Sequence, residues 1–209
     1  MSDITIGSRT APPAKDILQT YTGKVLKPLD PWPGDFDILD IAWSLAHQCR
    51  YNGHTRLFYS VATHSILVAH FLPAHLQLEG LLHDATEAYI SDLPSPIKQK
   101  MPEYRKVEDQ LAAVIATQYA LVYPEHAKVK WSDDYVFQLE AGLVMGGAIG
   151  AKFSIESLDR GYVEHEIIEA SNRTPASEAE RFLSVYRRIQ EHRGYALAVA
   201  RGERYESAN

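Results

Sequence analysis

Apolar side chains recur at intervals of three and four residues along most of the chain, and this spacing is typical of helices that bury one face. It predicts helices over about residues 38–49, 60–72, 76–89, 104–119, 132–143 and 177–189. Asp37 and Ser132 are expected to cap the first and fifth of these helices, and Ser177 with Glu180 forms a capping box for the last. Alternation typical of strands extends over only a few residues at a time, so we predict an all-α fold, a compact helical bundle.

Proline, glycine and polar residues mark the segments between these helices. Residues 1–37 are rich in proline and include LDPWPGD at 29–35, so we expect an irregular N-terminal arm packed on the body. The stretch from Gly146 to Pro175 has no clear period, and we expect a short hairpin near Phe153 to Val163. The predicted organisation is an arm over residues 1–37, one domain over 38–200 and a tail over 201–209.

The composition is that of an ordinary globular chain. Its 209 residues are 45% hydrophobic and 23% charged, which is enough apolar material for one well-buried core. The formal net charge of -6 and the pI near 5.8 leave no broad basic surface, which argues against a nucleic-acid polymer or an anionic membrane as a partner. A phosphate group must therefore be bound by a few local cations.

No segment of the sequence is typical of a membrane protein or an exported protein. The longest apolar run, Ala141 to Ala151, is far shorter than the ~20 residues that span a bilayer, and the N-terminus carries no apolar signal segment. Cys49 is the single cysteine, so no internal disulfide can form. These features lead us to expect a cytoplasmic protein.

The segment LLHDATEAY places three polar side chains on one predicted helix. At ~100° per residue, His83, Asp84 and Glu87 share one face, although apolar residues surround them. A charged cluster in such a setting requires a cation or a proton. An HD dipeptide also occurs by chance, and solvated side chains on a helix surface are the simple alternative.

Two further segments make a metal site the better interpretation. His64 lies on the very apolar predicted helix before the HD dipeptide, and Asp133 and Asp134 begin a later one, where Asp is most often only a cap. Together these segments provide the two imidazoles and two carboxylates with which helical bundles hold a divalent metal. Such a set suits Mn, Co, Fe, Zn or Ni better than Ca or Mg.

The order H…HD…D, with HDATE followed by SDLPSPIK, resembles the HD-domain metal-dependent phosphohydrolases. The resemblance covers residues 19 to about 143 and is strongest to small HD hydrolases of phages and bacteria, above all 5'-deoxynucleotidases and phage dATP triphosphohydrolases. It implies an HD-domain bundle with four metal ligands, namely His64, His83, Asp84 and Asp133. Asp134 is the alternative last ligand, because it directly follows Asp133.

The resemblance also implies roles for side chains around the metal. Glu87 matches the acid/base carboxylate, so we expect it with Asp84 to carry catalysis, and Asp92 matches the residue that faces the sugar 3'-hydroxyl. Asp92 can equally be a turn residue before Leu-Pro. Candidate phosphate-binding groups lie in RYNGHTR and after SDLPSP, namely Arg50, His54, Arg56 and Lys98. For Arg56 and Lys98 an ordinary surface charge is the simpler interpretation.

The expected function is hydrolysis of a deoxynucleotide. A 5'-deoxynucleotidase, which converts a deoxynucleoside monophosphate to deoxynucleoside and phosphate, is the first expectation, and a triphosphohydrolase that releases tripolyphosphate from a dNTP is the alternative. An HD module that binds a nucleotide without turnover, or a cyclic-nucleotide phosphodiesterase, is a further possibility. The resemblance also implies a homo-oligomer, a dimer or larger.

Overall fold

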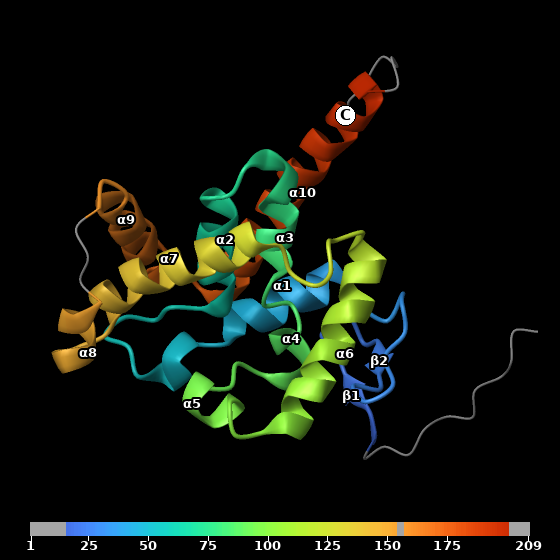
Figure 1. Cartoon of the computed structure of the whole chain (residues 1–209), viewed down its shortest axis with the longest axis horizontal. Coiled ribbons are helices and arrows are strands. Elements are labelled where there is room, and N and C mark those ends of the chain that lie inside the picture. The colour runs from blue at the N-terminus through green and yellow to red at the C-terminus, as the bar shows by residue number, and fades with distance from the viewer. Residues whose placement is uncertain (1–15, 154–156, 201–209) are drawn as a thin grey trace, which may run out of the picture.

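The computed structural model describes residues 16–153 and 157–200, the side chains of 197–200 excepted. The described chain is mostly helical and compact, so the predicted helical class is confirmed (Figure 1). The helices are α1 Ile38–His47, α2 Val61–His70, α3 Gln77–Leu82, α4 Glu87–Ile90, α5 Ser95–Lys98, α6 Pro102–Tyr119, α7 Ala127–Val144, α8 Gly147–Lys152, α9 Arg160–Ser171 and α10 Pro175–Ala200, with 3-10 turns over Arg50–Gly53 and Ala74–Leu76.

Helix α2 lies at the centre of the molecule. It contacts α1, α3, α7, α9 and α10, and each residue from Val61 to Ala69 is buried, as expected of a helix that is apolar on all sides. Ser60 caps its start by accepting a hydrogen bond from the backbone N–H of Thr63 at 3.1 Å. His64 is therefore fixed on the most enclosed helix of the fold.

Two apolar clusters meet at α2. The larger lies among α1, α3, α6 and α10 and includes Ile41, Leu45, Leu81, Leu111 and Phe182. The smaller lies among α2, α7 and α9 and includes Leu67, Val136, Leu139 and Ile167. Burial of these side chains stabilises the arrangement in which α2, α3 and α7 converge.

The arm contains a regular element that the sequence analysis did not predict. Leu18–Gln19 (β1) and Val25–Leu26 (β2) form a two-stranded antiparallel hairpin, seen beside α6 in Figure 1. The backbone N–H and hydroxyl of Thr22 donate to the carboxylate of Asp40 on α1, at 2.7 and 2.9 Å. The expectation of an irregular arm is wrong here because strands of two residues leave no alternating pattern. Residues 1–15 and the predicted tail, 201–209, lie outside the described residues.

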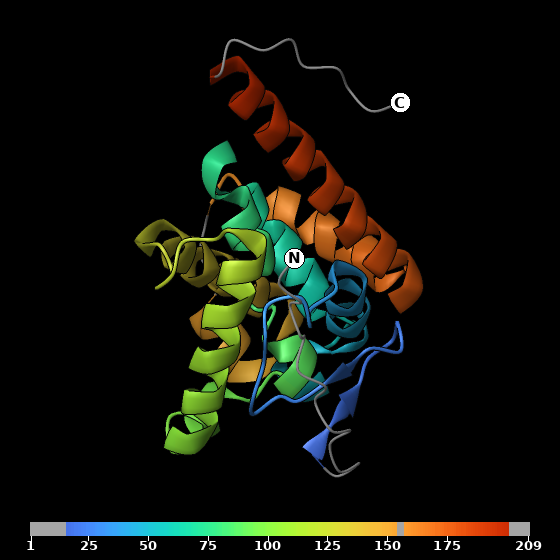
Figure 2. The same ribbon diagram turned by 90° about the vertical axis from the view of Figure 1, so that its right-hand side faces the viewer.

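Helix α10 packs along α1, and its C-terminal part extends beyond the body of the molecule (Figure 2). The predicted capping box is wrong, because the helix begins earlier, at Pro175. Thr174 Oγ1 accepts from the backbone N–H of Ser177 at 3.2 Å, and a proline in the first turn costs no helical hydrogen bond. The buried Glu178 accepts from Thr63 on α2 at 3.1 Å, which joins the two helices.

The second half of the chain is more helical than predicted. Helix α7 begins at Ala127, where His126 Nδ1 accepts from the backbone N–H of Lys128 at 3.1 Å, so Ser132 is not a cap. Ser132 lies buried in the helix and donates to the carbonyl of Val68 on α2 at 2.9 Å. The hairpin predicted near 153–163 is also wrong: Phe153 caps the end of α8, a turn lies at 158–159, and α9 begins at Arg160. Residues 154–156 lie outside the described part.

Within the described part of the chain, no helix has the length and apolar character needed to cross a membrane.

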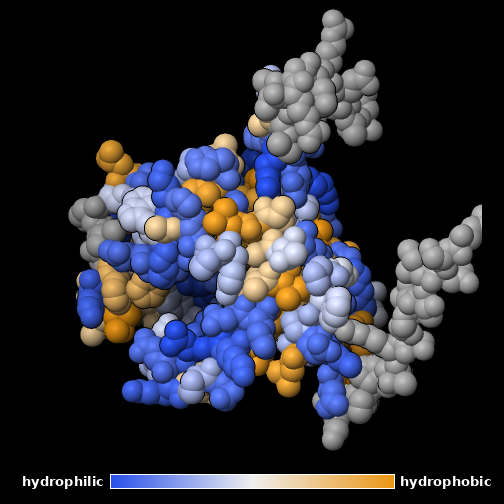
Figure 3. All heavy atoms as spheres, turned by 45° about the vertical axis from the view of Figure 1, so that its right-hand side comes forward, coloured by the Kyte–Doolittle hydropathy of each residue, from blue (hydrophilic) through white to orange (hydrophobic). Residues whose placement is uncertain are grey.

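One face of the molecule is covered mainly by hydrophilic side chains and is hollowed near its centre (Figure 3).

Candidate metal centre

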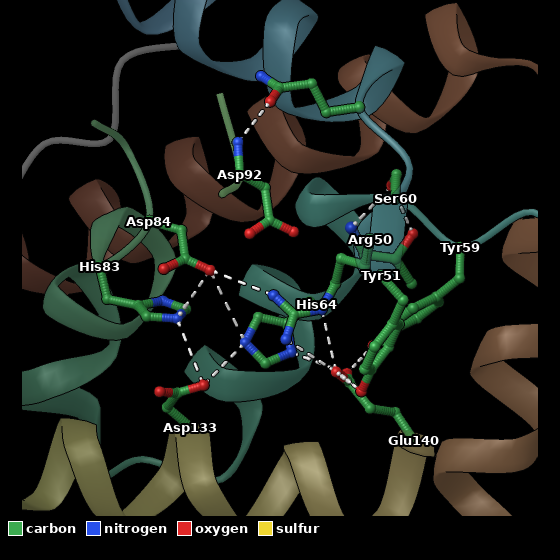
Figure 4. A network of polar contacts seen from close by, with 12 residues as sticks. Arg50, Tyr51, Tyr59, Ser60, His64, His83, Asp84, Asp92, Asp133 and Glu140 are labelled. Atoms are coloured by element: carbon green, nitrogen blue, oxygen red, sulfur yellow. Dashed lines mark hydrogen bonds and ion pairs between the residues drawn. The ribbon is translucent and has the colours of Figure 1, made fainter. Parts of the chain in front are cut away.

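Four candidate ligands come together from three parts of the chain (Figure 4). His64 lies on α2, His83 and Asp84 lie between α3 and α4, and Asp133 lies in the second turn of α7. The prediction that His83, Asp84 and Glu87 share one regular helix is wrong. The His83 ring bonds to the carbonyl of Gly80 at 2.8 Å, and the following backbone hydrogen bonds span three residues instead of four.

The ligand atoms of these residues form a closed ring. His64 Nε2 lies 3.1 Å from Asp133 Oδ1 and 3.9 Å from Asp84 Oδ2, and His83 Nε2 lies 3.9 and 3.2 Å from the same two oxygens. Ligand atoms bound to one ion at ~2.0–2.2 Å lie about 3–4 Å apart. His64, His83 and Asp133, with ligand atoms all within 4.8 Å of one another, could bind a metal ion.

Both imidazoles are oriented with Nε2 toward the centre of the ring. His64 Nδ1 lies 2.8 Å from Glu140 Oε2, and His83 Nδ1 donates to the carbonyl of Gly80. An occupied Nδ1 leaves the Nε2 lone pair for a metal. His83 Nε2 is buried and, although it lies 3.2 Å from Asp84 Oδ2, makes no well-directed hydrogen bond within the described chain. A mixed nitrogen and oxygen donor set with a buried nitrogen aimed at its centre therefore fits a transition metal or zinc.

The charges of the ring favour a bound cation. Burial alone would lower the pKa of His83, but the carboxylates of Asp84 and Asp133 outweigh burial and raise that pKa to about 10. Burial also opposes ionisation of Asp84, yet His83, His64 and Arg50 hold its pKa well below the usual range. The pKa of Asp133 is lowered in the same way, against burial, by its hydrogen bond with His64 and by the charge of His83. The two carboxylates thus favour a positive charge at His83 Nε2, and a divalent cation can take the place of the proton there.

Glu87 lies beside this ring at the start of α4. Its side chain is 5% exposed, and Oε2 has no hydrogen-bond partner among the described residues. Burial raises the pKa of Glu87 well above its ordinary value, and the nearby carboxylates of Asp84 and Asp92 raise it further. Glu87 therefore has the environment of a carboxylic acid that keeps its proton near neutral pH.

Arg50 lies on the other side of Asp84, on the 3-10 turn before α2. Its Nε donates to Glu140 Oε1 at 3.0 Å, and its Nη1 lies 3.4 Å from Asp84 Oδ2. Burial opposes its charge, but Glu140 and Asp84 raise the pKa of Arg50 well above the ordinary value. This guanidinium is therefore a fixed positive charge at the edge of the ring.

Glu140 is the central residue that the sequence analysis missed. It is fully buried on α7 and binds four side chains from elsewhere in the fold, namely Arg50, Tyr51, Tyr59 and His64. Despite burial, the charges of Arg50 and His64 hold the pKa of Glu140 at about 2. A signal was present in the sequence: Glu140 follows Asp133 by seven residues, which is two turns along the same helix face.

Asp92 and Lys98 lie near the ring without joining it. The backbone N–H of Asp92 donates to Gln48 Oε1 at 3.2 Å, and burial raises the pKa of its carboxyl group. Lys98 forms an ion pair with Glu108 on α6, although its charge acts on both Glu87 and Asp84. Asp92 is therefore a candidate for substrate contact, while Lys98 already has a partner.

The remaining candidates lie farther from the ring. Lys130 pairs with both Asp133 and Asp134, at 2.8 and 2.9 Å, but Asp134 is 60% exposed, whereas Asp133 also lies 3.1 Å from His64 Nε2, which favours Asp133 as the ligand. His54 is exposed on the 3-10 turn. Arg56 lies against Gly146, at the junction of α7 and α8. In the described part of the chain, neither His54 nor Arg56 has a side-chain contact with the four candidate ligands.

Comparisons with known proteins identify relatives but no activity. No protein-family model matches the chain. Uncharacterized protein YfdR of Escherichia coli (strain K12) is 43% identical over 99 residues, which cover 47% of this chain and 56% of that protein, little more than half its length. Uncharacterized protein RCAP_rcc00048 of Rhodobacter capsulatus is 35% identical over 139 residues, which cover 60% of this chain and 71% of that protein. The chain therefore belongs to the same family as this R. capsulatus protein.

Proposed function

We propose that the chain is an HD-domain phosphohydrolase that uses one divalent transition metal and acts on deoxynucleotides, most simply as a 5'-deoxynucleotidase. The observation that carries the proposal is the ring of His64, His83, Asp84 and Asp133 with the buried carboxyl group of Glu87, whose pKa is raised, beside it. A bound metal supplies Lewis acidity for a phosphate oxygen and for the water that attacks phosphorus.

Glu87 provides the proton for the reaction. Hydrolysis of a phosphate ester adds a hydroxyl group to phosphorus and requires a proton on the leaving oxygen. Glu87 Oε2 has no partner in the described chain and its pKa is raised, so the group can donate that proton and later recover one from solvent. In this proposal Glu87 is a catalytic residue because its carboxyl group contacts the leaving oxygen of the substrate.

Arg50 stabilises the phosphate in this proposal. A guanidinium has five N–H donors, and the contacts with Glu140 and Asp84 leave some of them free to bind a phosphate oxygen. Asp92 faces the same region with a carboxyl group whose pKa is raised by burial, so it suits a sugar hydroxyl. We further propose a cytoplasmic enzyme that forms a homo-oligomer, with neither a nucleic-acid polymer nor a membrane as partner.

Product analysis separates this function from its alternatives. Purified protein loaded with Mn or Co is incubated with dAMP, AMP, dATP, ATP and a cyclic nucleotide, and the products are resolved by chromatography. Deoxyadenosine with orthophosphate from dAMP is the expected result. Tripolyphosphate from dATP instead identifies a triphosphohydrolase, and turnover of the cyclic nucleotide identifies a phosphodiesterase. No turnover with the metal verified in place contradicts the enzyme proposal and favours a binding module.

A further inference from the structure

A small cavity lies directly behind His83. It measures about 80 Å³, is partly open to solvent, and is lined by residues of α3, of α6 and of the segments 83–86 and 121–126. His83 belongs both to its wall and to the metal centre, so the cavity and the metal are neighbours. The volume is several times what one ordered water needs and accommodates one edge of a planar ring.

The walls of this cavity are mainly apolar, and several of its side chains are small. Leu82, Ile115 and Leu121 provide flat aliphatic contact, and Ala112 and Ala116 leave space that larger residues would fill. At the segment that closes the cavity, Val122 and Tyr123 are 54% and 46% exposed. Apolar side chains around a concave site are typical of sites that bind the faces of a ring.

One buried carboxylate breaks this apolar lining. Glu79, one turn before His83 on α3, is 9% exposed, and its Oε2 has no hydrogen-bond partner in the described chain. A buried polar atom without a partner is uncommon in folded proteins and requires an explanation. Carboxylate oxygens accept hydrogen bonds, so the group that would complete this contact is a donor.

A second metal ion does not account for this carboxylate. Glu125 and His126 also line the cavity, yet within the described residues the only group of three or more candidate ligands close enough to hold an ion is His64, His83 and Asp133. The apolar walls likewise favour a ring over a hydrated cation. The required ligand therefore combines flat apolar faces with an edge of adjacent N–H groups.

We propose that this cavity binds the base of the nucleotide whose phosphate lies at the metal centre, and that Glu79 selects guanine. The inference rests on the proposed function and adds the substrate's base to it. The N1–H and the exocyclic amino group of guanine lie side by side and match the acceptor oxygens of one carboxylate. Thymine presents its N–H between two carbonyl oxygens, which a carboxylate repels.

Direct binding of free deoxynucleosides tests the cavity without using hydrolysis. Deoxyguanosine, deoxyinosine and thymidine are titrated into metal-loaded protein, and affinities are measured by calorimetry or ligand-observed NMR. Deoxyinosine is the sharp comparison, because it differs from deoxyguanosine only by lacking the amino group. We expect deoxyguanosine to bind about ten- to hundredfold more tightly than either of the others, the usual effect of one hydrogen bond to a charged group.

Variants of cavity residues test whether the preference for deoxyguanosine arises in the cavity. Glu79→Gln should abolish the preference for deoxyguanosine, while Glu164→Gln, the same change on an exposed position of α9, should retain it. Ala112→Leu should fill the cavity and weaken all three nucleosides about equally, with metal content unchanged. Equal affinity of the wild-type protein for the three nucleosides, no binding of any of them, or an unchanged preference in Glu79→Gln overturns the inference.

The two proposals fail separately. A protein that releases phosphate from deoxynucleotides without base preference overturns the guanine cavity and leaves the hydrolase in place. A protein that binds deoxyguanosine through Glu79 but hydrolyses no phosphate ester retains the cavity and overturns the hydrolase.

Discussion

The Nδ1 atom of His64 lies 2.8 Å from Oε2 of Glu140, and both side chains are fully buried. A carboxylate in this position fixes the ring orientation and strengthens Nε2 as a metal ligand. Because the same carboxylate also holds Arg50, it couples the metal ligand to the proposed phosphate-binding cation. Glu140 is therefore a positioning residue for both parts of the centre.

Replacement of Glu140 by Gln tests this relationship. The variant keeps the shape of the side chain but removes the charge that faces Arg50 and His64. We expect metal affinity to fall about 10- to 100-fold. The free energy of unfolding should fall by about 3 kcal/mol, because a buried arginine loses its charged partner. Metal titration and urea unfolding measure the two effects.

Asp134→Asn is the matched control on the same helix. Its exposed ion pair with Lys130 is worth about 1 kcal/mol or less, and metal affinity should not change. Wild-type metal affinity in Glu140→Gln would contradict the positioning role.

Metal binding should release a proton from His83. Its pKa, about 10 in the folded protein, exceeds the ~6.5 of a free histidine, so the charged form stabilises the metal-free fold fully below pH ~6.5 and this contribution is lost as the pH rises through about 10. A metal ion must displace the Nε2 proton. Apparent affinity should therefore increase about tenfold per pH unit from neutral pH toward about pH 9.

Calorimetry in buffers of different ionisation enthalpy counts the released protons directly. We expect about one proton per metal ion at neutral pH. An affinity that stays constant over this pH range, with no proton released, is inconsistent with a protonated His83 in the metal-free protein.

Asp133 and Asp134 can be distinguished by metal content. Both carboxylates pair with Lys130, but Asp133 also lies 3.1 Å from His64 Nε2, whereas Asp134 is exposed on the surface. Asp133→Ala should purify without metal, and Asp134→Ala should retain it, as measured by elemental analysis after dialysis. The opposite result would make Asp134 the last ligand.

Glu87→Gln should separate metal binding from turnover. Its Oε2 atom has no hydrogen-bond partner in the described chain, and Glu87 is not one of the four ring residues, so metal content should match the wild type. Loss of an acid/base group slows turnover about 10²- to 10⁴-fold. Wild-type activity in this variant would remove Glu87 from the mechanism.

The sequence predicted the helical class and the three segments that meet at the ring. Those segments are strongly periodic, and imidazole and carboxylate side chains within apolar helices stand out from their neighbours. Glu140 was missed because its signal in the sequence, the seven-residue spacing from Asp133, is weak by itself, and its four partners come from distant residues that only the fold brings together. The site roles of Glu87, Asp92 and Arg50 remain predictions.

The smaller errors in the predicted helices each have a specific structural cause. Ser132 has the residue type of a helix cap but uses its hydroxyl to bind the carbonyl of Val68 across the helix interface, which no local pattern indicates. Helices α8 and α9 escaped prediction because glycines and exposed polar residues weaken the apolar period there. At the break after Leu82, the His83 side chain bonds to the carbonyl of Gly80 and the next backbone hydrogen bonds span three residues, which the regular apolar period does not indicate.

Metal-dependent release of phosphate tests the central claim most directly. Protein stripped with a chelator is titrated with Mn or Co while orthophosphate from dAMP is measured, with His83→Ala in parallel. The account predicts no release from the stripped protein, full release near one metal equivalent per chain, and none from His83→Ala at any metal concentration near stoichiometry. Equal hydrolysis with and without metal, or by His83→Ala, would contradict it.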